Sequence, residues 1–533
     1  MLNFPMKRSD RHALTVALVA IVVLLLKTVW ILSTSVRALG TTTWILDDAF
    51  IEINVARMIA LGHGFSFDGL HPTSGSPLLW TYLLSIPHYF MNFDRAVQWD
   101  FVLSAIFGAL SAVIVFFLAR RVTGRTPIAW TAFLLALLSG NAFLNGMNAM
   151  DTAFFTFAGL LAFALSFDVG RPKSCPAWAW GALTGLAAGA ALMTRADGLF
   201  LLIPLVSVHV INLAQAFRRA EWRDELEQMI GIMVVAALCV SVYIGWHLVH
   251  TGAPFPANQA GRRELALALH GVTFQTISLP LYLKIVIWNT FQLAHLIDIA
   301  MGSVLLGILA LLTGAILPMT RRFSLMSALY MGTFFAALIL YQWYFPDLHG
   351  LRYINLSVHL LFILVAALLW NLPLSRLRGV GSASMVACIL LFTWYLHYQM
   401  SSRFPWAKFM SYVGRPTAED LDRSWRVIDW MRTHVPPGAA IGVRDHGKVA
   451  LFSGHPIQDL AGNIDPVVPV HVREHTLAPY LHSRAVEYIF IPAGRNDLLY
   501  QEIHRSLVLA PTAGYPSFEE GILYKIDWTR SHP

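Results

Sequence analysis

The chain has 533 residues, of which 56% are hydrophobic and only 13% are charged. Soluble domains carry about twice that charged fraction, and the mean hydropathy here is +0.58. The composition therefore excludes a water-soluble enzyme, a secreted disulfide scaffold and a disordered chain, and the long apolar runs exclude an outer-membrane barrel. A polytopic α-helical membrane protein remains, because only closed hydrogen-bonding patterns are stable in lipid hydrocarbon.

The net charge of +7 comes from 38 basic and 31 acidic residues. In a membrane protein such an excess is typical of cytoplasmic loops, so we expect no nucleic acid as a partner. Cys175, Cys239 and Cys388 fit neither a disulfide framework nor a zinc-binding spacing. There is also no glycine-rich nucleotide loop. We therefore predict neither a cofactor nor a resident metal.

Apolar stretches long enough to cross a bilayer recur up to about residue 398. A spanning helix needs roughly 17–25 mostly apolar residues. We predict an α-helical polytopic membrane domain over residues 1–398, with about eleven spans at residues 13–33, 98–118, 127–144, 152–167, 177–193, 198–214, 230–250, 292–317, 324–343, 353–370 and 380–398.

Clusters of Lys and Arg predict the orientation, because they favour the cytoplasmic side. All of them fall on one side if residues 77–91, a short stretch that contains Pro77 and Pro87, lie along the outer interface instead of crossing. The N-terminus is then cytoplasmic and the loop over 34–97 lies outside. The alternative is a crossing at 77–91, which would place the basic cluster over 120–125 outside.

Residues 399–533 differ from the rest, since they are richer in Arg, Asp, His and Pro and have no spanning run. We predict a soluble extracytoplasmic α/β domain, large enough for a core of its own. Its expected elements are a helix over 420–434, ended by Pro436-Pro437-Gly438, and short strands over 439–443, 486–491 and 522–526. Asp445-His446-Gly447 is expected to form a turn after the first strand.

Ionisable residues collect in the turns that this topology places outside. Such groups are costly beside hydrocarbon and therefore suggest a function. Their repeated placement at one face predicts a single polar cavity that opens outward. The residues are Asp47, Asp48, Asp151, Arg195, Asp197, Asp347 and Arg352.

The first outer loop contains a predicted amphipathic helix over 49–61, with apolar residues at helical spacing and Gly62 at its end. Asp48 and Glu52 are one turn apart and are able to face the same space. Asp48 is also a good N-cap for this helix, so a purely structural role is the alternative.

A series of short motifs follows one another along the chain. They are Asp47-Asp48-Ala49-Phe50-Ile51, Ala56-Arg57, Gly62-His63-Gly64-Phe65, Pro77-Leu78-Leu79-Trp80, Met150-Asp151-Thr152, Thr194-Arg195-Ala196-Asp197-Gly198, Gly252-Ala253-Pro254-Phe255-Pro256-Ala257-Asn258 followed by Arg262-Arg263, and Gly350-Leu351-Arg352-Tyr353. Their order resembles the GT-C glycosyltransferases, polytopic enzymes that use polyprenyl-phosphate sugars, and among these the bacterial arabinofuranosyltransferase group. That group has Glu where Asp151 stands and Pro where Ala196 stands.

The resemblance implies an integral membrane glycosyltransferase that moves a sugar, with a pentofuranose such as arabinose favoured, from a polyprenyl-phosphate donor to a glycan or glycoconjugate acceptor of the cell envelope, with inversion. It implies a bacterial inner (plasma) membrane protein whose active site and C-terminal domain face outward. An aspartate of the first outer loop would be the base that takes the proton of the acceptor hydroxyl. Asp47 and Asp48 both fit this role, with Asp48 slightly preferred.

Fixed positive charge is needed beside the departing phosphate, and arginine suits phosphate through bidentate hydrogen bonds. Arg352 is the first choice because it borders a span. For Arg195 the structural alternative is a simple pairing with Asp197 or Asp151. The expected phosphate-binding residues are Arg352, Arg195, Arg57, Arg262 and Arg263. The expected supporting or acceptor-binding residues are Glu52, Asp151, Asp197, His63 and His349.

Two other functions stay open. A transporter or flippase of lipid-linked sugars would be expected to show repeats and ionisable residues near the bilayer midplane, whereas here the acids collect at one face. A metal-dependent transferase of lipid-diphosphate oligosaccharides is the second alternative. Asp47, Asp48, Glu52 and Asp151 have the oxygen ligands that Mg²⁺ or Ca²⁺ prefers, although relatives with lipid-monophosphate donors are thought not to require a metal.

Overall fold

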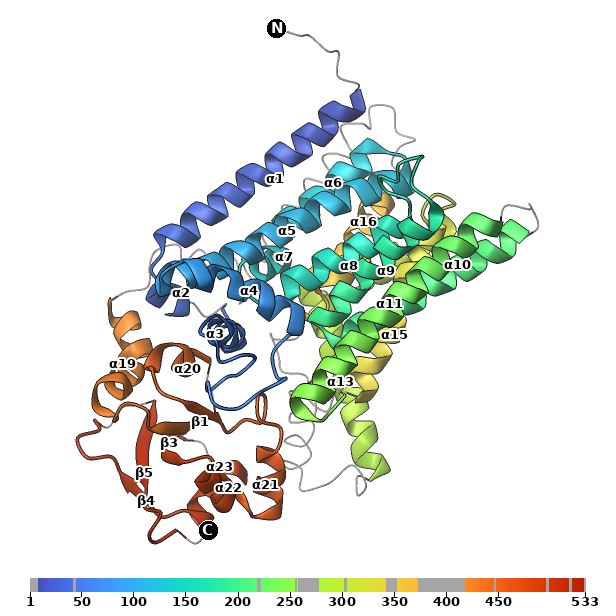
Figure 1. The fold of residues 1–533 in the computed structure, drawn as a ribbon. Coiled ribbons are helices and arrows are strands. Elements are labelled where there is room, and N and C mark those ends of the chain that lie inside the picture. The colour runs from blue at the N-terminus through green and yellow to red at the C-terminus, as the bar shows by residue number, and fades with distance from the viewer. Residues whose placement is uncertain are drawn as a thin grey trace.

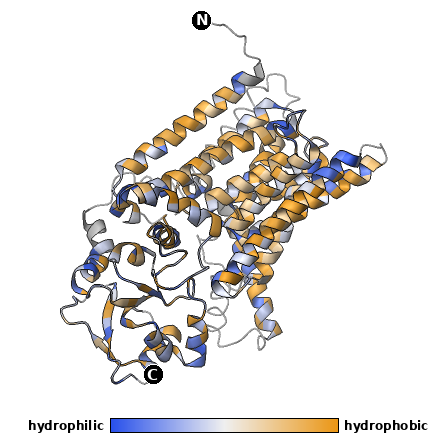
Figure 2. Ribbon diagram, in the orientation of Figure 1, coloured by the Kyte–Doolittle hydropathy of each residue, from blue (hydrophilic) through white to orange (hydrophobic). Residues whose placement is uncertain are grey.

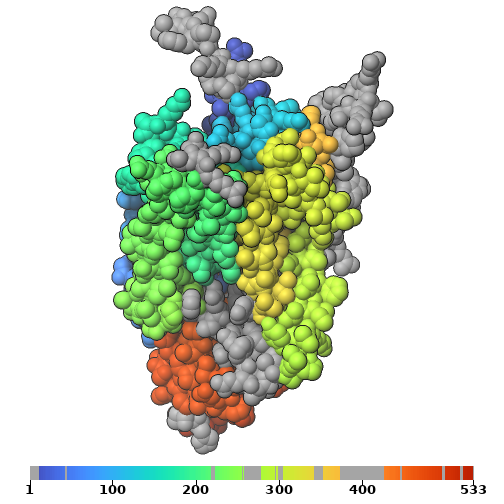
Figure 3. Space-filling view, turned by 90° about the vertical axis from the view of Figure 1, so that its right-hand side faces the viewer, coloured from blue at the N-terminus to red at the C-terminus, as the bar shows by residue number. Residues whose placement is uncertain are grey.

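The computed structural model describes residues 8–41, 45–217, 222–254, 256, 278–301, 304–341, 352–371, 418–444, 447–494, 498–516 and 520–531. Within these ranges the apolar helices form an elongated bundle, and the C-terminal domain is attached to one end of it (Figure 1). Hydrophobic residues dominate the bundle, whereas the C-terminal domain mixes polar and apolar residues (Figure 2). The space-filling view shows the C-terminal domain beneath columns of helices (Figure 3).

Apolar helices make up the predicted membrane domain. In the described part of the chain, five stretches are long and apolar enough to cross a membrane: Arg11–Ser33, Phe93–Thr123, Ala196–Phe217, Trp222–Thr251 and Arg321–Leu340. The helices are α1 (Arg8–Ser33), α2 (Val36–Thr41), α3 (Asp47–Ala60), α4 (Leu78–Phe90), α5 (Phe93–Thr123), α6 (Thr126–Leu138), α7 (Gly140–Asn145), α8 (Thr152–Ser166), α9 (Ala177–Thr194), η1 (Ala196–Leu201), α10 (Leu202–Phe217), α11 (Trp222–Thr251), α13 (Leu279–Met301), α14 (Val304–Ile316), α15 (Arg321–Tyr341) and α16 (Asn355–Asn371).

The predicted span over 292–317 corresponds to two helices, α13 and α14. The side-chain amide of Asn289 donates to the carbonyl of Ile339 at 3.2 Å, and the hydroxyl of Ser324 donates to the carbonyl of Leu311 at 2.8 Å. These bonds join the two helices to opposite ends of α15, so α13 and α14 run together antiparallel to it as one interrupted element. The predicted span over 380–398 lies outside the described residues, and the total of about eleven spans stays a prediction.

The stretch over 77–91 forms the short helix α4, which has 13 residues. At 1.5 Å per residue it is about 20 Å long, too short for a hydrocarbon core of about 30 Å. Trp80 and Leu84 bury their side chains against Phe50 of α3 and Phe101 of α5. This packing holds α4 against the loop helices at the end of the bundle near the C-terminal domain, as an interfacial helix requires.

The backbones of α9 and α11 are in close contact, a feature that the sequence analysis did not predict. Gly181 and Gly185 are four residues apart and lie on one face of α9. A Cβ at Gly181 would lie 2.0 Å from the carbonyl oxygen of Gln228, and one at Gly185 would lie 2.6 Å from that of Ile232. These glycines therefore set the spacing between α9 and α11.

The C-terminal domain contains a five-stranded sheet of order β2-β1-β3-β5-β4. β1 pairs in parallel with β2 and β3, and β5 pairs antiparallel with β3 and β4. The predicted helix and three strands are present as α19 (Ala418–His434), β1 (Ala440–Val443), β3 (Val486–Pro492) and β5 (Gly521–Ile526). The remaining elements are α20 (Gly447–Ser453), β2 (Ile457–Asp459), α21 (Val468–Glu474), α22 (Leu477–Ser483), α23 (Leu498–Ser506) and β4 (Leu509–Pro511).

The C-terminal domain shares part of its core with the first outer loop. Val55 of α3 belongs to the same buried cluster as Met431 of α19, and the hydroxyl of Thr73 donates to the carbonyl of Ile464 at 3.0 Å. A second cluster lies wholly within the C-terminal domain. The expectation of an independent core is therefore only partly met, because the loop and the domain are packed as one unit.

Replacement of Gly185 by Leu should destabilise the protein, because the added side chain would displace the backbone of α11. Overpacking of this kind costs about 1–3 kcal/mol. Gly245→Leu in α11 is the matched control, since among the described atoms a Cβ at Gly245 meets nothing within 4 Å. Thermal unfolding of both variants in the same detergent measures the difference. Equal unfolding midpoints would contradict the proposed role of Gly185.

Candidate active site

Charged side chains from four separate segments meet where the helices approach the C-terminal domain. They come from α3, from the turn before α8, from the junction of α9 and η1, and from the short segment before α16. We call this set the acid–arginine cluster. Its members are Asp48, Glu52, Asp151, Arg195, Asp197 and Arg352.

The shortest contact in the cluster between distant segments joins Asp48 to Arg352. The Nη1 of Arg352 lies 2.8 Å from the Oδ2 of Asp48, and the side chains are 9% and 21% exposed. A buried guanidinium needs an anionic partner, so the sequence-predicted pairing of the first outer loop with the segment before α16 is present. Asp48 does not cap α3, because Leu46 occupies the N-cap position and makes no side-chain cap bond.

Arg195 is held by two carboxylates. Its Nε and Nη2 each donate to Asp197 at 2.9 Å, and its Nη1 lies 3.6 Å from the Oδ1 of Asp151. The structural alternative for Arg195 therefore describes what this side chain does here. Asp197 thus occupies both the Nε and the Nη2 of Arg195. Asp48, by contrast, contacts Arg352 through its Nη1.

Tyr353 separates the two arginines of the cluster and was missed as a site residue by the sequence analysis. The guanidinium carbon of Arg195 lies 4.6 Å from the centre of the Tyr353 ring, and that of Arg352 lies 5.0 Å from it. The Nη2 of Arg352 also donates to the Tyr353 hydroxyl at 3.1 Å. The ring thus fixes both cations by cation–π contact. Its position directly after Arg352 in the Gly-Leu-Arg-Tyr motif was the available signal.

Glu52 is the buried acid at the centre of the cluster. Its Oε2 accepts the backbone N–H of Asp151 at 3.2 Å. Burial raises the pKa of Glu52 well above its ordinary value, and the carboxylates of Asp151 and Asp48 raise it further, while Arg352 partly opposes them. The site therefore favours the neutral form of Glu52 over its carboxylate.

Burial also raises the pKa of Asp151, although Arg195 and Arg352 oppose this effect. For both arginines, burial disfavours the cation but the neighbouring anions outweigh it, so that each pKa is raised. Arg195 and Arg352 therefore stay charged. The arrangement places two permanent cations beside the exposed edge formed by Asp48.

Asp47 does not join the cluster. Its Oδ2 accepts the backbone N–H of Gly447 at 2.6 Å, and its Oδ1 accepts that of Lys448 at 2.9 Å. Both oxygens thus bind the start of α20 and tie the C-terminal domain to α3. Across the ranges that the structure describes, no three His, Cys, Asp or Glu side chains are grouped as metal ligands.

Other predicted site residues lie elsewhere. Arg57 contacts the carbonyl of Leu451 at 3.4 Å and the ring of Phe93 at 5.1 Å, on the side of α3 that faces α20. His63 is exposed in the loop after α3. Neither residue shares a contact with the acid–arginine cluster. Arg262, Arg263 and His349 lie outside the described residues.

Buried amides extend the cluster into the bundle, and the sequence analysis did not identify them. Asn355, one turn after Arg352, donates to the hydroxyl of Thr156 at 2.8 Å and accepts from the side chain of Asn141 at 3.1 Å. Asn145 donates to the side-chain oxygen of Asn141 at 2.9 Å. This network links α7, α8 and α16 beneath the charged side chains, and it fixes the segments that carry Asp151 and Arg352.

Comparisons with known proteins agree with this architecture. Residues 67–252 match the family of dolichyl-phosphate-mannose-protein mannosyltransferases, and residues 416–529 match a domain of unknown function, DUF8728. ArnT from Cupriavidus metallidurans, in a structure with undecaprenyl phosphate bound, is similar with a TM-score of 0.58 at 12% identity, over 98% of this chain and 99% of that one. No curated protein sequence matches.

The oligosaccharyltransferase of Archaeoglobus fulgidus in its apo form is also similar, with a TM-score of 0.54 at 12% identity, over 89% of this chain and 69% of that one. Its complex with an inhibitory peptide and a dolichol-phosphate gives a TM-score of 0.50 at 11% identity, over the same shares. The shared architecture shows the GT-C fold. The match over residues 67–252 to a family of such membrane glycosyltransferases agrees with this fold. The arabinofuranosyltransferase group stays a prediction.

Replacement of Glu52 by Gln should change how stability depends on pH. A carboxyl whose pKa is raised on folding keeps its proton in the native state after the unfolded chain has lost it. Stability is therefore lost as pH rises above 4.5, the ordinary value for this group, by up to about 1.4 kcal/mol per pH unit. Glu52→Gln should remove this loss, so that the variant gains on the wild type between pH 5 and pH 8.

Thermal unfolding across that pH range measures the effect. Glu474→Gln is the control, because Glu474 is an exposed residue of the C-terminal domain whose side chain pairs with Arg473. Parallel stability profiles of the wild type and Glu52→Gln would show that Glu52 is not held protonated.

Proposed function

We propose that this enzyme transfers a sugar from a polyprenyl-phosphate donor to a glycan or glycoconjugate acceptor of the cell envelope, with inversion and with a pentofuranose such as arabinose as the favoured sugar. The observation that carries the proposal is the ion pair between Asp48 and Arg352 at the edge of a buried cluster. It puts a carboxylate beside a permanent cation, which are the two groups that this reaction needs.

In the proposed reaction the acceptor hydroxyl oxygen attacks the anomeric carbon, and the bond from that carbon to the phosphate oxygen breaks. The electron pair leaves with the phosphate, and the hydroxyl proton passes to Asp48 as general base. Arg352 stabilises the charge on the departing phosphate. A donor phosphate bound at Arg352 competes with Asp48 for the same guanidinium, so donor binding would release the carboxylate to act as a base.

Asp47, the other proposed catalytic aspartate, is better suited to docking. Both of its oxygens bind amides of the C-terminal domain, whereas Asp48 lies within the cluster. Arg195 is proposed to support the phosphate site mainly through its charge, because Asp197 occupies its Nε and Nη2.

A bacterial inner-membrane location with an outward-facing site is proposed on the distribution of charge. Arg121 and Arg322 donate to the carbonyls of Phe167 and Ser166, at the end of α8 remote from Asp151. The acid–arginine cluster and the C-terminal domain occupy the other end. Because basic residues favour the cytoplasmic side, the site and the C-terminal domain would face outward.

Asp48→Asn should abolish transfer, with a loss of about 10²–10⁴-fold in kcat, because a neutral amide does not accept the proton. Asp47→Asn should keep most of the activity and instead lower the unfolding temperature, since it weakens the contact with α20. The assay uses purified protein in nanodiscs, a radiolabelled polyprenyl-phosphoryl arabinose or mannose, and a panel of oligosaccharide acceptors.

Full activity of a folded Asp48→Asn variant would refute the proposed base. Loss of activity after EDTA treatment, restored by Mg²⁺ or Mn²⁺, would instead support the metal-dependent lipid-diphosphate alternative. Movement of the intact lipid-linked sugar across a sealed vesicle without transfer would support the flippase.

Arg352→Lys should raise the KM for the donor by about 10- to 100-fold, because hydrogen bonds between charged groups are strong and lysine lacks the bidentate fork. Arg57→Lys is the matched comparison, as Arg57 faces Leu451 and Phe93 instead of the cluster. Steady-state kinetics at saturating acceptor give both values. An unchanged KM for the donor in Arg352→Lys, together with a raised KM in Arg57→Lys, would contradict the proposal. It would place the phosphate-binding site beside Arg57, on the other side of α3.

A further inference from the structure

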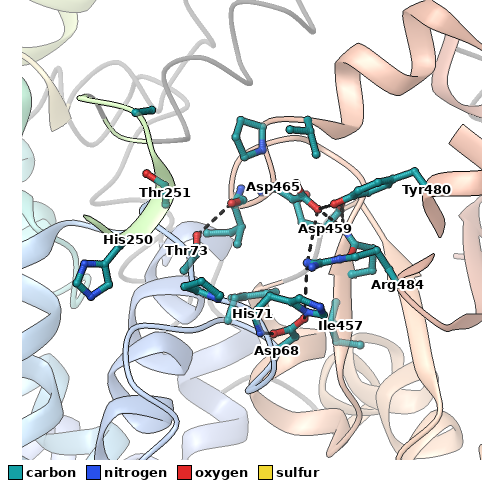
Figure 4. A pocket seen from close by; sticks show the side chains of 17 residues that line it. Asp68, His71, Thr73, His250, Thr251, Ile457, Asp459, Asp465, Tyr480 and Arg484 are labelled. Atoms are coloured by element: carbon teal, nitrogen blue, oxygen red, sulfur yellow. Dashed lines mark hydrogen bonds and ion pairs between the residues drawn. The ribbon is translucent and has the colours of Figure 1, made fainter. Parts of the chain in front are cut away.

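A second pocket lies between the membrane domain and the C-terminal domain. It has a volume of about 310 Å³, and none of the acid–arginine cluster lines it. Its walls come from the loop after α3, from the end of α11, and from the segment that runs from β2 to α22 (Figure 4). We call it the interdomain pocket. The polar residues lining it include Asp68, His71, Thr251, Asp459, Asp465 and Arg484.

Arg484 is the centre of the polar wall. Its Nε donates to the side-chain oxygen of Gln458 at 3.0 Å. Its Nη2 lies 3.8 Å from the Oδ2 of Asp68 and 3.7 Å from the Oδ2 of Asp465. Figure 4 shows the guanidinium between the loop of the membrane domain and the C-terminal domain. The guanidinium of Arg484 therefore lies at ion-pair distance from one carboxylate of the loop and one of the C-terminal domain.

Much hydrogen-bonding capacity of this wall is unused. Among the described residues, Arg484 makes one hydrogen bond within 3.5 Å, although a guanidinium has five N–H donors. Its side chain is 19% exposed, and that of Asp465 is 11% exposed. The carboxylate of Asp465 is fixed by the hydroxyl of Tyr480 and by the amide of Gln458 at 2.8 Å. Donors and acceptors are thus held rigidly at the surface of a cavity.

The lining favours a neutral polyhydroxylated ligand. Asp68 and Asp465 lie at ion-pair distance from the one guanidinium, and the carboxylate of Asp459 also lines the pocket. Acidic groups therefore outnumber Arg484, so a phosphate or a carboxylate would be repelled. A sugar hydroxyl both donates and accepts hydrogen bonds, and adjacent carboxylate and guanidinium groups satisfy both roles. Phe67 and Ile464 add apolar surface for the C–H faces of a ring. A cavity of this size and mixed lining suits a small ligand.

The pocket is connected to the proposed catalytic helix. The side-chain amide of Asn54 in α3 donates to the carbonyl of Phe67 in the pocket wall at 2.8 Å. Asn54 and Asp48 are on the same helix, about 9 Å apart along its axis at 1.5 Å per residue. Because none of the cluster residues lines the pocket, a ligand that occupies both the pocket and the space beside Asp48 has more than one sugar unit.

We propose that the interdomain pocket binds a neutral sugar unit of the acceptor glycan, behind the unit that receives the transferred sugar. This inference rests on the proposed function for its role, but the binding itself does not depend on transfer. The pocket, which the first outer loop and the C-terminal domain form jointly, would then select acceptors by their length and charge.

Binding of neutral arabino- and manno-oligosaccharides of one to four units tests the proposal, using saturation-transfer NMR and calorimetry with the full chain in nanodiscs and no donor present. The wild type should bind trisaccharides at least tenfold more tightly than monosaccharides. Arg484→Gln should weaken trisaccharide binding at least tenfold. Arg505→Gln is the matched control, because Arg505 is in the same domain, is exposed, and pairs with Glu502, which does not line the pocket.

A second variant tests the proposal even if Arg484→Gln does not fold. Ala253→Trp fills the rim of the pocket and leaves the contacts of Arg484 intact, so it should also weaken trisaccharide binding. Absence of binding by every probe, or equal binding by the wild type and Ala253→Trp, would overturn the proposal. Oligosaccharide binding without any transfer from the donors would refute the proposed function but keep this site.

Discussion

The burial of Arg352 against Asp48 is the constraint on which the rest of the site depends. A guanidinium that is 9% exposed requires an anion close by. Asp48 supplies it from α3, so the loop that contains α3 has to lie against the start of α16. Tyr353 and the bond to Met150 at 3.8 Å then fill the remaining space around the cation. The arrangement brings together segments about 300 residues apart in the chain and excludes water from all but its edge.

α3 connects this cluster to the C-terminal domain and to the interdomain pocket. Asp47 at its start binds α20, Asp48 and Glu52 face the arginines, and Asn54 holds the wall of the interdomain pocket. A change in the docking of the C-terminal domain would therefore move the proposed base directly. This connection accounts for the close packing of the C-terminal domain on the loop that carries the proposed base, with a shared hydrophobic core between them.

Much of this organisation could be predicted from the sequence, because hydrophobic length and the placement of ionisable residues are local properties. The apolar helices, the short helix α4 and the meeting of Asp48 with Arg352 follow from such patterns. Packing between helices cannot be predicted in this way. The glycine contact of α9 with α11 depends on which faces of the two helices meet. The sequence also could not distinguish Asp47 from Asp48. The two side chains point about 100° apart around α3, and only the position of α20 shows that Asp47 binds the C-terminal domain while Asp48 faces Arg352. The three-residue strands β2 and β4 carry too few residues for a periodic pattern.

The protonation of Glu52, which its raised pKa favours, decides how the cluster balances its charge. If Glu52 were ionised, four carboxylates would face two arginines, and an incoming donor phosphate would meet a strongly negative site. With Glu52 protonated, Asp197 is matched by Arg195 through two hydrogen bonds of 2.9 Å, and Arg352 is shared by Asp48 and Asp151. The phosphate then has to displace only the contact between Asp48 and Arg352. The burial that raises the pKa of Glu52 thus leaves the ion pair between Asp48 and Arg352 as the contact that a donor phosphate would replace in the proposed reaction.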